Sequence, residues 1–148
     1  MPTIAALLLC TVVGVSDGDT LTARCNAQTI TVRLAEVDAP EKAQPFGNRS
    51  RQHLAALCFQ QRAEVRPIAA NGGVDRYGRT VAHVACNGKD ANTAQVQAGL
   101  AWVFDRYVSD GWLYWAQEDA RAARRGLWSD AQPVAPWEWR RTSPPVGR

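Results

Sequence analysis

Carboxylates and arginines recur at three places along this chain, in combinations able to bind a metal ion and a phosphate. Carboxylate oxygens are the ligands that Ca²⁺ and Mg²⁺ prefer. Arginines neutralise a phosphate and the charge that grows on it in a transition state, and a further carboxylate can take a proton from water. If the loops converge, these groups suffice for metal-assisted phosphodiester hydrolysis. The candidate set is Asp17, Asp19, Arg33, Asp38, Glu41 and Arg79.

Each segment taken by itself has an ordinary structural explanation. Asp17-Gly18 is a common turn, residues 38–41 form a loop that leads into a helix, and residues 75–79 form a charged hairpin tip. Together the acids and arginines would also fit a structural ion-pair network. Only the elements that carry these residues, and their order, separate these explanations.

Alternating apolar residues predict the strands that position these groups. Ile30, Val32 and Leu34 share one face, and the apolar phase slips at Val37, which predicts a sharp bend just before Asp38. Periodicity also predicts a long helix over 112–125 with Leu113, Ala116, Ala120, Ala123 and Leu127 inward and Gly126 at its end. The other predicted elements are strands at 11–15, 21–24, 28–37, 63–68 and 79–86 and helices at 48–61 and 92–98.

Four cysteines at wide spacing, with no C-x-x-C pair, favour disulfides over a zinc site. Centring the first hairpin on Asp17 and Gly18 places Cys10 opposite Cys25, which predicts a bridge unless a bulge shifts the register. By elimination, Cys58 pairs with Cys86. This pattern favours an oxidising compartment.

The length of 148 residues, with 46% hydrophobic and 21% charged residues, predicts one globular domain. No apolar run approaches the roughly 20 residues of a membrane-spanning helix. Fifteen of the 17 basic residues are arginine, whose planar fork suits phosphate, although a net charge of +3 is weak support for a polyanionic partner. We expect a leader remnant or disordered segment at 1–9, a domain at 10–130, and a Pro-, Trp- and Arg-rich tail at 131–148, either docked or loose.

Four motifs, taken in order, resemble the staphylococcal nuclease (thermonuclease) family. They are Val15-Ser16-Asp17-Gly18-Asp19-Thr20, the segment Val32 to Glu41, Asp75-Arg76-Tyr77-Gly78-Arg79-Thr80, and Gly99-Leu100-Ala101. The resemblance covers roughly residues 10–130. It implies an α+β fold with a five-stranded OB-type barrel capped by three helices, and Ca²⁺-dependent cleavage of DNA and RNA.

The resemblance also implies a role for particular residues. Metal ligands fall on Asp19, Asp38 and the backbone carbonyl of Ala39, and the general base falls on Glu41. The phosphate-binding arginines fall on Arg33 and Arg79, with cleavage of the 5′ P–O bond leaving a 3′-phosphate. Further substrate contacts fall on Arg76, Tyr77 and Tyr107, while a second tyrosine near the base is replaced by Asp105.

The leading hypothesis is therefore a Ca²⁺-dependent endonuclease acting on DNA and RNA, periplasmic or secreted, monomeric and without a membrane partner. A non-catalytic nucleic-acid-binding module of the same fold is the alternative. Such modules usually lack part of the catalytic set, whereas none of it is missing here.

Overall fold

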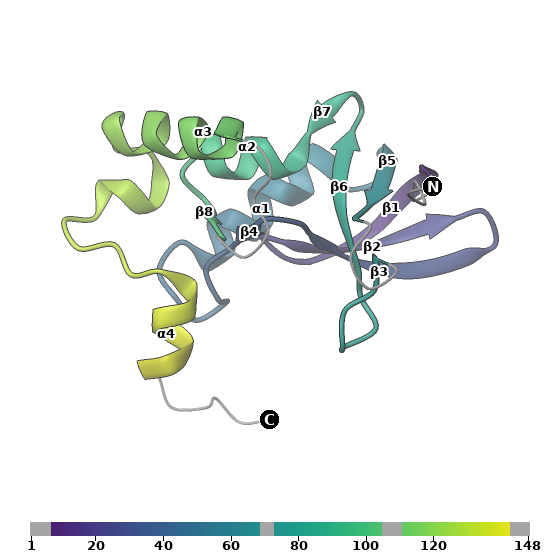
Figure 1. The fold of residues 1–148 in the computed structure, drawn as a ribbon, viewed down its shortest axis with the longest axis horizontal. Helices are drawn as coiled ribbons and strands as arrows, with labels where there is room; N and C mark the ends of the chain where they lie inside the picture. The colour runs from purple at the N-terminus through teal and green to yellow at the C-terminus, as the bar shows by residue number, and fades with distance from the viewer. Residues whose placement is uncertain (1–6, 69–72, 105–110, 143–148) are drawn as a thin grey trace.

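A computed structural model of the chain describes residues 7–68, 73–104 and 111–142, and five strands form the barrel at its centre (Figure 1). Antiparallel pairings join β1 to β2 and β5, β2 to β3, and β5 to β6. The parallel pairing of β3 with β6, in which Arg33 lies opposite Val81, closes the ring. The barrel strands are β1 (Leu8–Asp17), β2 (Thr20–Cys25), β3 (Gln28–Leu34), β5 (Arg62–Pro67) and β6 (Thr80–Cys86). The predicted α+β barrel is confirmed, and β1 begins three residues before the predicted strand at 11–15.

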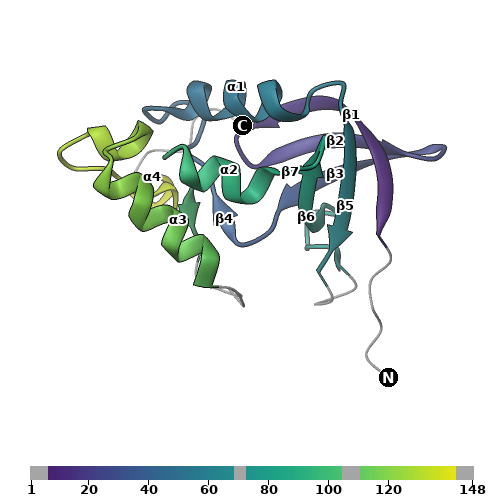
Figure 2. The same cartoon turned by 90° about the horizontal axis from the view of Figure 1, so that it is seen from above.

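Helices cover one side of this barrel, as Figure 2 shows from above. Two of the predicted helices are α1 (Gly47–Cys58) and α2 (Ala91–Gln97), and the third is α3 (Gly111–Ala122). The remaining elements are β4 (Val37–Asp38), β7 (Lys89–Asp90), β8 (Trp102–Val103), the 3-10 helix η2 (Gly126–Ser129) and α4 (Pro136–Thr142). None of the helices within the described ranges has the length and apolar character needed to cross a membrane.

The core lies between the barrel wall and the helices. All five barrel strands and the first three helices contribute apolar side chains to it, because alternate strand residues and one stripe of each helix point inward. The central members are Val12, Leu21, Val32, Leu34, Leu54, Val65, Val84, Val96, Leu113 and Ala116.

Near its turn, the first hairpin has a register that differs from the prediction, and two bulges in β1 restore the predicted pairing at Cys10. The turn residues are Gly18 and Asp19 rather than Asp17 and Gly18, because Asp17 pairs with Thr20. Irregularities in β1 between Val12 and Gly14 and between Val15 and Asp17 then restore the predicted pairing further from the turn. Cys10 therefore lies opposite Cys25 as expected, and the disulfides Cys10–Cys25 and Cys58–Cys86 are both present.

The bend predicted before Asp38 is confirmed. Strand β3 ends at Leu34, Glu36 adopts a left-handed backbone conformation with φ of 68°, and β4 begins at Val37. The chain therefore turns sharply, and β4 pairs with β8 instead of continuing the barrel wall.

The end of α3 departs from its prediction. The helix stops at Ala122, and the left-handed φ of 54° at Arg124 turns the chain, which leaves Ala123 exposed rather than inward. Gly126, the predicted stop, lies close to Gly99. A Cβ on Gly126 would lie 2.4 Å from the Gly99 carbonyl oxygen, so this contact requires glycine.

Candidate active site

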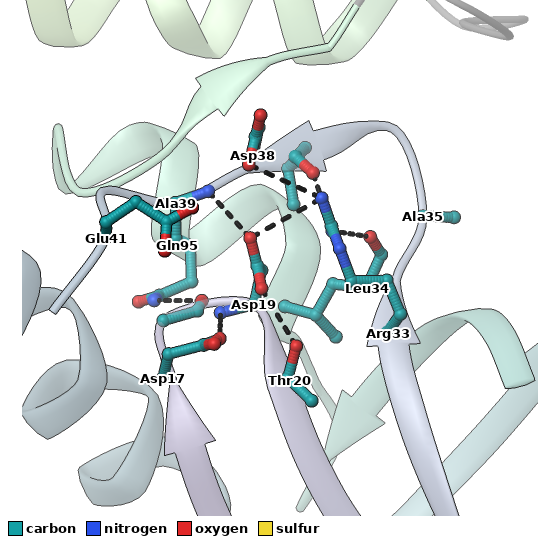
Figure 3. A network of polar contacts seen from close by, with 12 residues as sticks. Asp17, Asp19, Thr20, Arg33, Leu34, Ala35, Asp38, Ala39, Glu41 and Gln95 are labelled. Atoms are coloured by element: carbon teal, nitrogen blue, oxygen red, sulfur yellow. Dashed lines mark hydrogen bonds and ion pairs between the residues drawn. The ribbon is translucent and has the colours of Figure 1, made fainter. Parts of the chain in front are cut away.

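Arg33 of β3 lies at the centre of a cluster that also includes Asp19, from the turn between β1 and β2, and Asp38 of β4 (Figure 3). Its Nη1 donates to the carbonyl oxygens of Leu34 at 2.6 Å and Val37 at 2.7 Å, so the bend itself fixes the guanidinium. Its Nη2 lies 3.5 Å from both Asp19 Oδ2 and Asp38 Oδ1. The bend thus brings two motifs that are far apart in the sequence to one arginine.

The turn that carries Asp19 packs against α1 and is hydrogen-bonded to α2. Gln95 of α2 is fully buried, and its Nε2 donates to the carbonyl oxygens of Gly18 at 2.7 Å and Ser50 at 3.0 Å. Its Oε1 contacts Nδ1 of His53. A Cβ on Gly18 would lie 1.8 Å from Ser50 Oγ, so the turn packs directly on α1. Gln95, Ser50 and His53 form what we call the Gln95 brace.

Asp19 is buried, and both of its side-chain oxygens accept a hydrogen bond. Its Oδ1 accepts a hydrogen bond from Thr20 Oγ1 at 2.9 Å, and its Oδ2 accepts one from the Ala39 N–H at 2.8 Å. The backbone N–H of Asp19 donates to Asp17 Oδ1 at 3.0 Å. Asp19, Ala39 and Asp38 are therefore neighbours, as the predicted cation site requires.

A second arginine, from the C-terminal helix α4, reaches the other side of the cluster. The Nη2 of Arg140 lies 2.6 Å from Asp38 Oδ2, and its Nη1 lies 2.6 Å from Glu41 Oε1. Asp38 is almost fully buried, whereas the Glu41 side chain is 42% exposed. Arg140 therefore links the predicted metal ligand to the predicted general base.

The segment 75–79 forms a separate, preorganised tip. The Arg79 Nε lies 2.8 Å from Asp75 Oδ2, and the backbone N–H groups of Tyr77 and Arg79 donate to Asp75 Oδ1. The guanidinium carbons of Arg76 and Arg79 lie 4.9 Å and 5.2 Å from the centre of the exposed Tyr77 ring. Two arginines and a tyrosine are thus presented together to solvent.

The tip and the Arg33 cluster line one cavity of about 1150 Å³. Arg79 also lines this cavity, but its ion pair is with Asp75 and not with the clustered carboxylates. The predicted residues therefore line one cleft, in which Asp19 and Asp38 lie beside Arg33, Glu41 is joined to Asp38 through Arg140, and the tip is a separate unit. Tyr107 and Asp105 lie outside the described residues.

The aspartates differ in the way their surroundings affect their protonation. Burial, and then the charge of Asp19, raise the pKa of Asp17 to about 7. Burial also raises the pKa of Asp19, but Arg33 and the hydrogen bonds outweigh it and hold that pKa below its ordinary value. Burial raises the pKa of Asp38 in spite of Arg140 and Arg33. Of these three aspartates, only Asp19 has its pKa lowered, which favours its ionised form.

The donor set is suited to a hard cation. Asp19 and Asp38 are buried carboxylates that both lie 3.5 Å from Arg33 Nη2, and Ca²⁺ or Mg²⁺ binds such oxygens while keeping positions for water and phosphate. Among the described residues, no group of three or more His, Cys, Asp or Glu side chains could hold a metal ion. A cation here would rest on two carboxylates and backbone oxygen.

Two parts of this site were not predicted from the sequence. Arg140 lies 99 residues from Glu41 in the chain, and its helix was expected only as a tail. Gln95 was assigned to a short helix without a role. One available signal for Arg140 was its spacing of three residues from Trp137, which places an aromatic anchor and a cation on one helical face.

Comparison with known proteins identifies the family. The model of the family described as staphylococcal nuclease homologue matches residues 31–130. The chain is 43% identical over 143 residues to the micrococcal nuclease of Shigella flexneri, covering 89% of this chain and 80% of that protein. It is 44% identical over 133 residues to a protein of Haemophilus influenzae described as an uncharacterized endonuclease, covering 89% and 72%.

A plant protein is also similar. The staphylococcal-like nuclease CAN1 of Arabidopsis thaliana is 33% identical over 115 residues, which is 78% of this chain and 34% of that protein. This chain belongs to the staphylococcal nuclease family. The nucleases among its relatives support a hydrolytic nuclease function, and with it a nucleic-acid substrate.

Proposed function

We propose that this protein is a Ca²⁺-dependent endonuclease that hydrolyses phosphodiester bonds of DNA and RNA at the 5′ P–O bond and leaves 3′-phosphates. The observation that carries the proposal is the convergence of Asp19, Asp38 and Glu41 with Arg33 in one cleft of a staphylococcal nuclease fold. Every one of these side chains is supported by a neighbour, which suits a preorganised site.

Ca²⁺ would be held by Asp19, Asp38 and the carbonyl of Ala39. When bound, the cation supplies positive charge to the phosphate and favours ionisation of water. The structure supports this assignment through the burial of both carboxylates and through the hydrogen bond that keeps Ala39 beside Asp19.

Glu41 is proposed as the general base. Its carboxylate takes a proton from the attacking water, the water oxygen forms a bond to phosphorus, and the bond between phosphorus and the 5′ oxygen breaks. The leaving 5′ oxygen takes up a proton from a water molecule. Glu41 is the most exposed carboxylate of the cluster, so water and substrate reach it from the cleft.

Arg33 and Arg79 are proposed to contact the phosphate. Arg33 is held by two carbonyl oxygens, which keeps its guanidinium in place while charge builds on the phosphate. Arg79, Arg76 and Tyr77 form a tip that suits a neighbouring phosphate and its sugar. Tyr107 remains proposed as a substrate contact by resemblance alone.

Digestion of single-stranded DNA and of RNA by the pure protein, with Ca²⁺, with Mg²⁺ and with chelator, tests the reaction. Cleavage that requires Ca²⁺ and leaves 5′-hydroxyl ends, which a polynucleotide kinase labels directly, is expected. Binding without cleavage under every metal would instead establish the non-catalytic module.

Glu41→Ala tests the base, with Glu64→Ala as the matched control. Glu64 lies exposed on β5. Losing a general base lowers turnover by about 10²–10⁴-fold. We expect that loss for Glu41→Ala and wild-type turnover for Glu64→Ala. Unchanged turnover in Glu41→Ala would overturn the assigned role.

The compartment and the assembly state are part of the same proposal. Two disulfides suit a periplasmic or secreted protein, because thiols stay reduced in most cytoplasms. One chain supplies all the described site residues, which supports action as a monomer. Fractionation of the producing cells and the mass in solution test these two points.

A further inference from the structure

The C-terminal helix α4 places a guanidinium at the centre of the proposed reaction. Arg140 holds both oxygens of Asp38, with Nη2 at 2.6 Å from Oδ2 and Nη1 at 3.3 Å from Oδ1, and the same Nη1 lies 2.6 Å from Glu41 Oε1. A lysine ammonium could not reproduce this planar fork. Its contacts with Asp38 and Glu41 place Arg140 within reach of a phosphate bound between these two residues.

Packing against β8 anchors α4 beside this site. Trp137, one helical turn before Arg140, packs against Trp102 and Phe104 with ring centres 5.6 Å and 5.7 Å apart. Trp102 is the residue that pairs with Asp38 between β8 and β4, so the anchor of α4 and the target of Arg140 are adjacent. In Figure 1, α4 lies below β8.

The segment before α4 is fixed as well. Ala135 and Pro136 are buried, and Gln44 Nε2 donates to the Val134 carbonyl oxygen at 2.6 Å. Because Gln44 belongs to the same loop as Glu41, α4 is tied to the loop that carries the proposed base. The position of Arg140 is therefore set by the fold and not by its own ion pairs alone.

Formal charge shows what Arg140 adds. The three carboxylates of Asp19, Asp38 and Glu41 and the guanidinium of Arg33 have a net formal charge of −2, and a divalent cation would bring it to zero. A phosphodiester brings a negative charge to that neutral centre, and a second develops during attack on phosphorus. Arg79 is paired with Asp75, whereas Arg140 lines the same cavity beside Asp38 and Glu41, and its side chain is 45% exposed.

We infer that Arg140 is a phosphate-binding residue of the active site, supplied by the C-terminal helix. Without the cation, Asp38 and Glu41 hold its guanidinium; with the cation on Asp38, the guanidinium turns to a phosphate oxygen of the substrate. The inference rests on the proposed nuclease function. It makes α4 part of the catalytic cleft.

Binding measurements on the full chain test this inference without relying on turnover. The probe is a fluorescent phosphorothioate single-stranded oligonucleotide, which resists cleavage, and anisotropy reports its affinity with Ca²⁺ and with chelator. The variants are Arg140→Gln and Arg140→Lys. Arg141→Gln is the matched control, because Arg141 is 74% exposed and pairs with Glu138. Melting curves establish that each variant is folded.

The expected result is a selective loss of phosphate affinity. A charge-assisted hydrogen bond contributes about 1.5–3 kcal/mol, so Arg140→Gln lowers affinity for the oligonucleotide in Ca²⁺ by about 10–100-fold. Arg140→Lys keeps the charge without the planar fork, so its affinity for the oligonucleotide lies between those of the wild type and Arg140→Gln. The affinity of Arg141→Gln stays within about threefold of the wild type. We expect calorimetry to show that Arg140→Gln binds Ca²⁺ at least as tightly as the wild type does, because the guanidinium that competes for Asp38 is gone.

Two results would overturn the inference. Unchanged or tighter oligonucleotide binding by a folded Arg140→Gln protein would show that Arg140 does not bind phosphate. It would then only compete with the metal ion or hold α4 in place. Weaker Ca²⁺ binding in that variant would show that Arg140 acts through the orientation of Asp38. If the wild type binds but never cleaves, the nuclease proposal fails, whereas an Arg140-dependent affinity would still stand.

Discussion

Replacing Gln95 by leucine tests whether the Gln95 brace holds the turn that presents Asp19. Gln95 is fully buried, and its Nε2 lies 2.7 Å from the Gly18 carbonyl oxygen and 3.0 Å from that of Ser50. Leucine is of similar size, so the change removes the amide without opening a large cavity. The energetic effect is therefore mainly polar.

The magnitude follows from the groups left without a partner. Gly18 is buried, so its carbonyl oxygen cannot turn to bulk water, and a buried unsatisfied group costs about 1–3 kcal/mol. The second hydrogen bond, to Ser50, contributes about 1 kcal/mol more. His53 is only half-buried and can reach water, so losing its contact with Gln95 adds little to the cost. We expect Gln95→Leu to lower the free energy of unfolding by about 2–4 kcal/mol.

Thermal unfolding with chelator present measures this change. For a domain of this size about 1 kcal/mol corresponds to roughly 3–4 °C, which gives a Tm lower by about 6–16 °C. Gln97→Leu is the control, because Gln97 lies exposed on the same helix. A Tm for Gln95→Leu within about 2 °C of the wild type would refute the reasoning and show that Gly18 finds another partner. Calorimetric titration of the folded variant should also give weaker Ca²⁺ binding, because the turn that carries Asp19 loosens.

Three further changes have expected outcomes. Arg33→Lys should lower the free energy of unfolding by about 1–3 kcal/mol and reduce nucleic-acid cleavage, since one ammonium cannot both bond the two carbonyl oxygens, as Nη1 does, and lie beside the aspartates, as Nη2 does; a melting temperature and a digestion rate equal to those of the wild type would contradict this. Burial and the charge of Asp19 raise the pKa of Asp17 from 3.8 to about 7, so the folded state binds this proton more tightly and the contribution to stability falls as pH rises from about 4 to 7. Asp17→Asn, in chelator, should therefore raise the free energy of unfolding by about 1–4 kcal/mol more at pH 8 than at pH 4, measured by urea unfolding; an equal change at the two pH values would contradict the raised pKa. Replacing Cys58 and Cys86 together by alanine should cost about 2–4 kcal/mol by the same measurement, and peptide mapping of the wild type should find the two bridges described; free thiols would count against them.

Local patterns were sufficient to predict most of the barrel. The alternation at Ile30, Val32 and Leu34 and the slip at Val37 give the third strand and its bend, because both depend on which face is buried. The Cys10–Cys25 pairing was predicted although the turn was misplaced by one residue. Two bulges in β1 compensate for that error, and no property of single residues marks where a bulge falls.

The features that sequence reasoning missed are long-range polar contacts. Gln95 and Gly18 lie 77 residues apart, and Arg140 and Asp38 lie 102 residues apart. Such contacts depend on how the helices pack on the barrel, which periodicity does not describe. Ala123 was misplaced for a similar reason, because the left-handed turn at Arg124, a residue that rarely adopts this conformation, ends α3 early.

The seam between β3 and β6 affects when in folding the site can form. Residues 32–34 pair there with residues 80–82, so Arg33 and the tip that carries Arg79 come together only when this distant pairing forms. Contacts of such high sequence separation form slowly, because the loop between them must first lose its entropy. A partly folded or newly synthesised chain would therefore lack an assembled cleft. On the proposed function, hydrolytic activity begins only when folding is complete, and a cell making this nuclease is protected from it in the meantime.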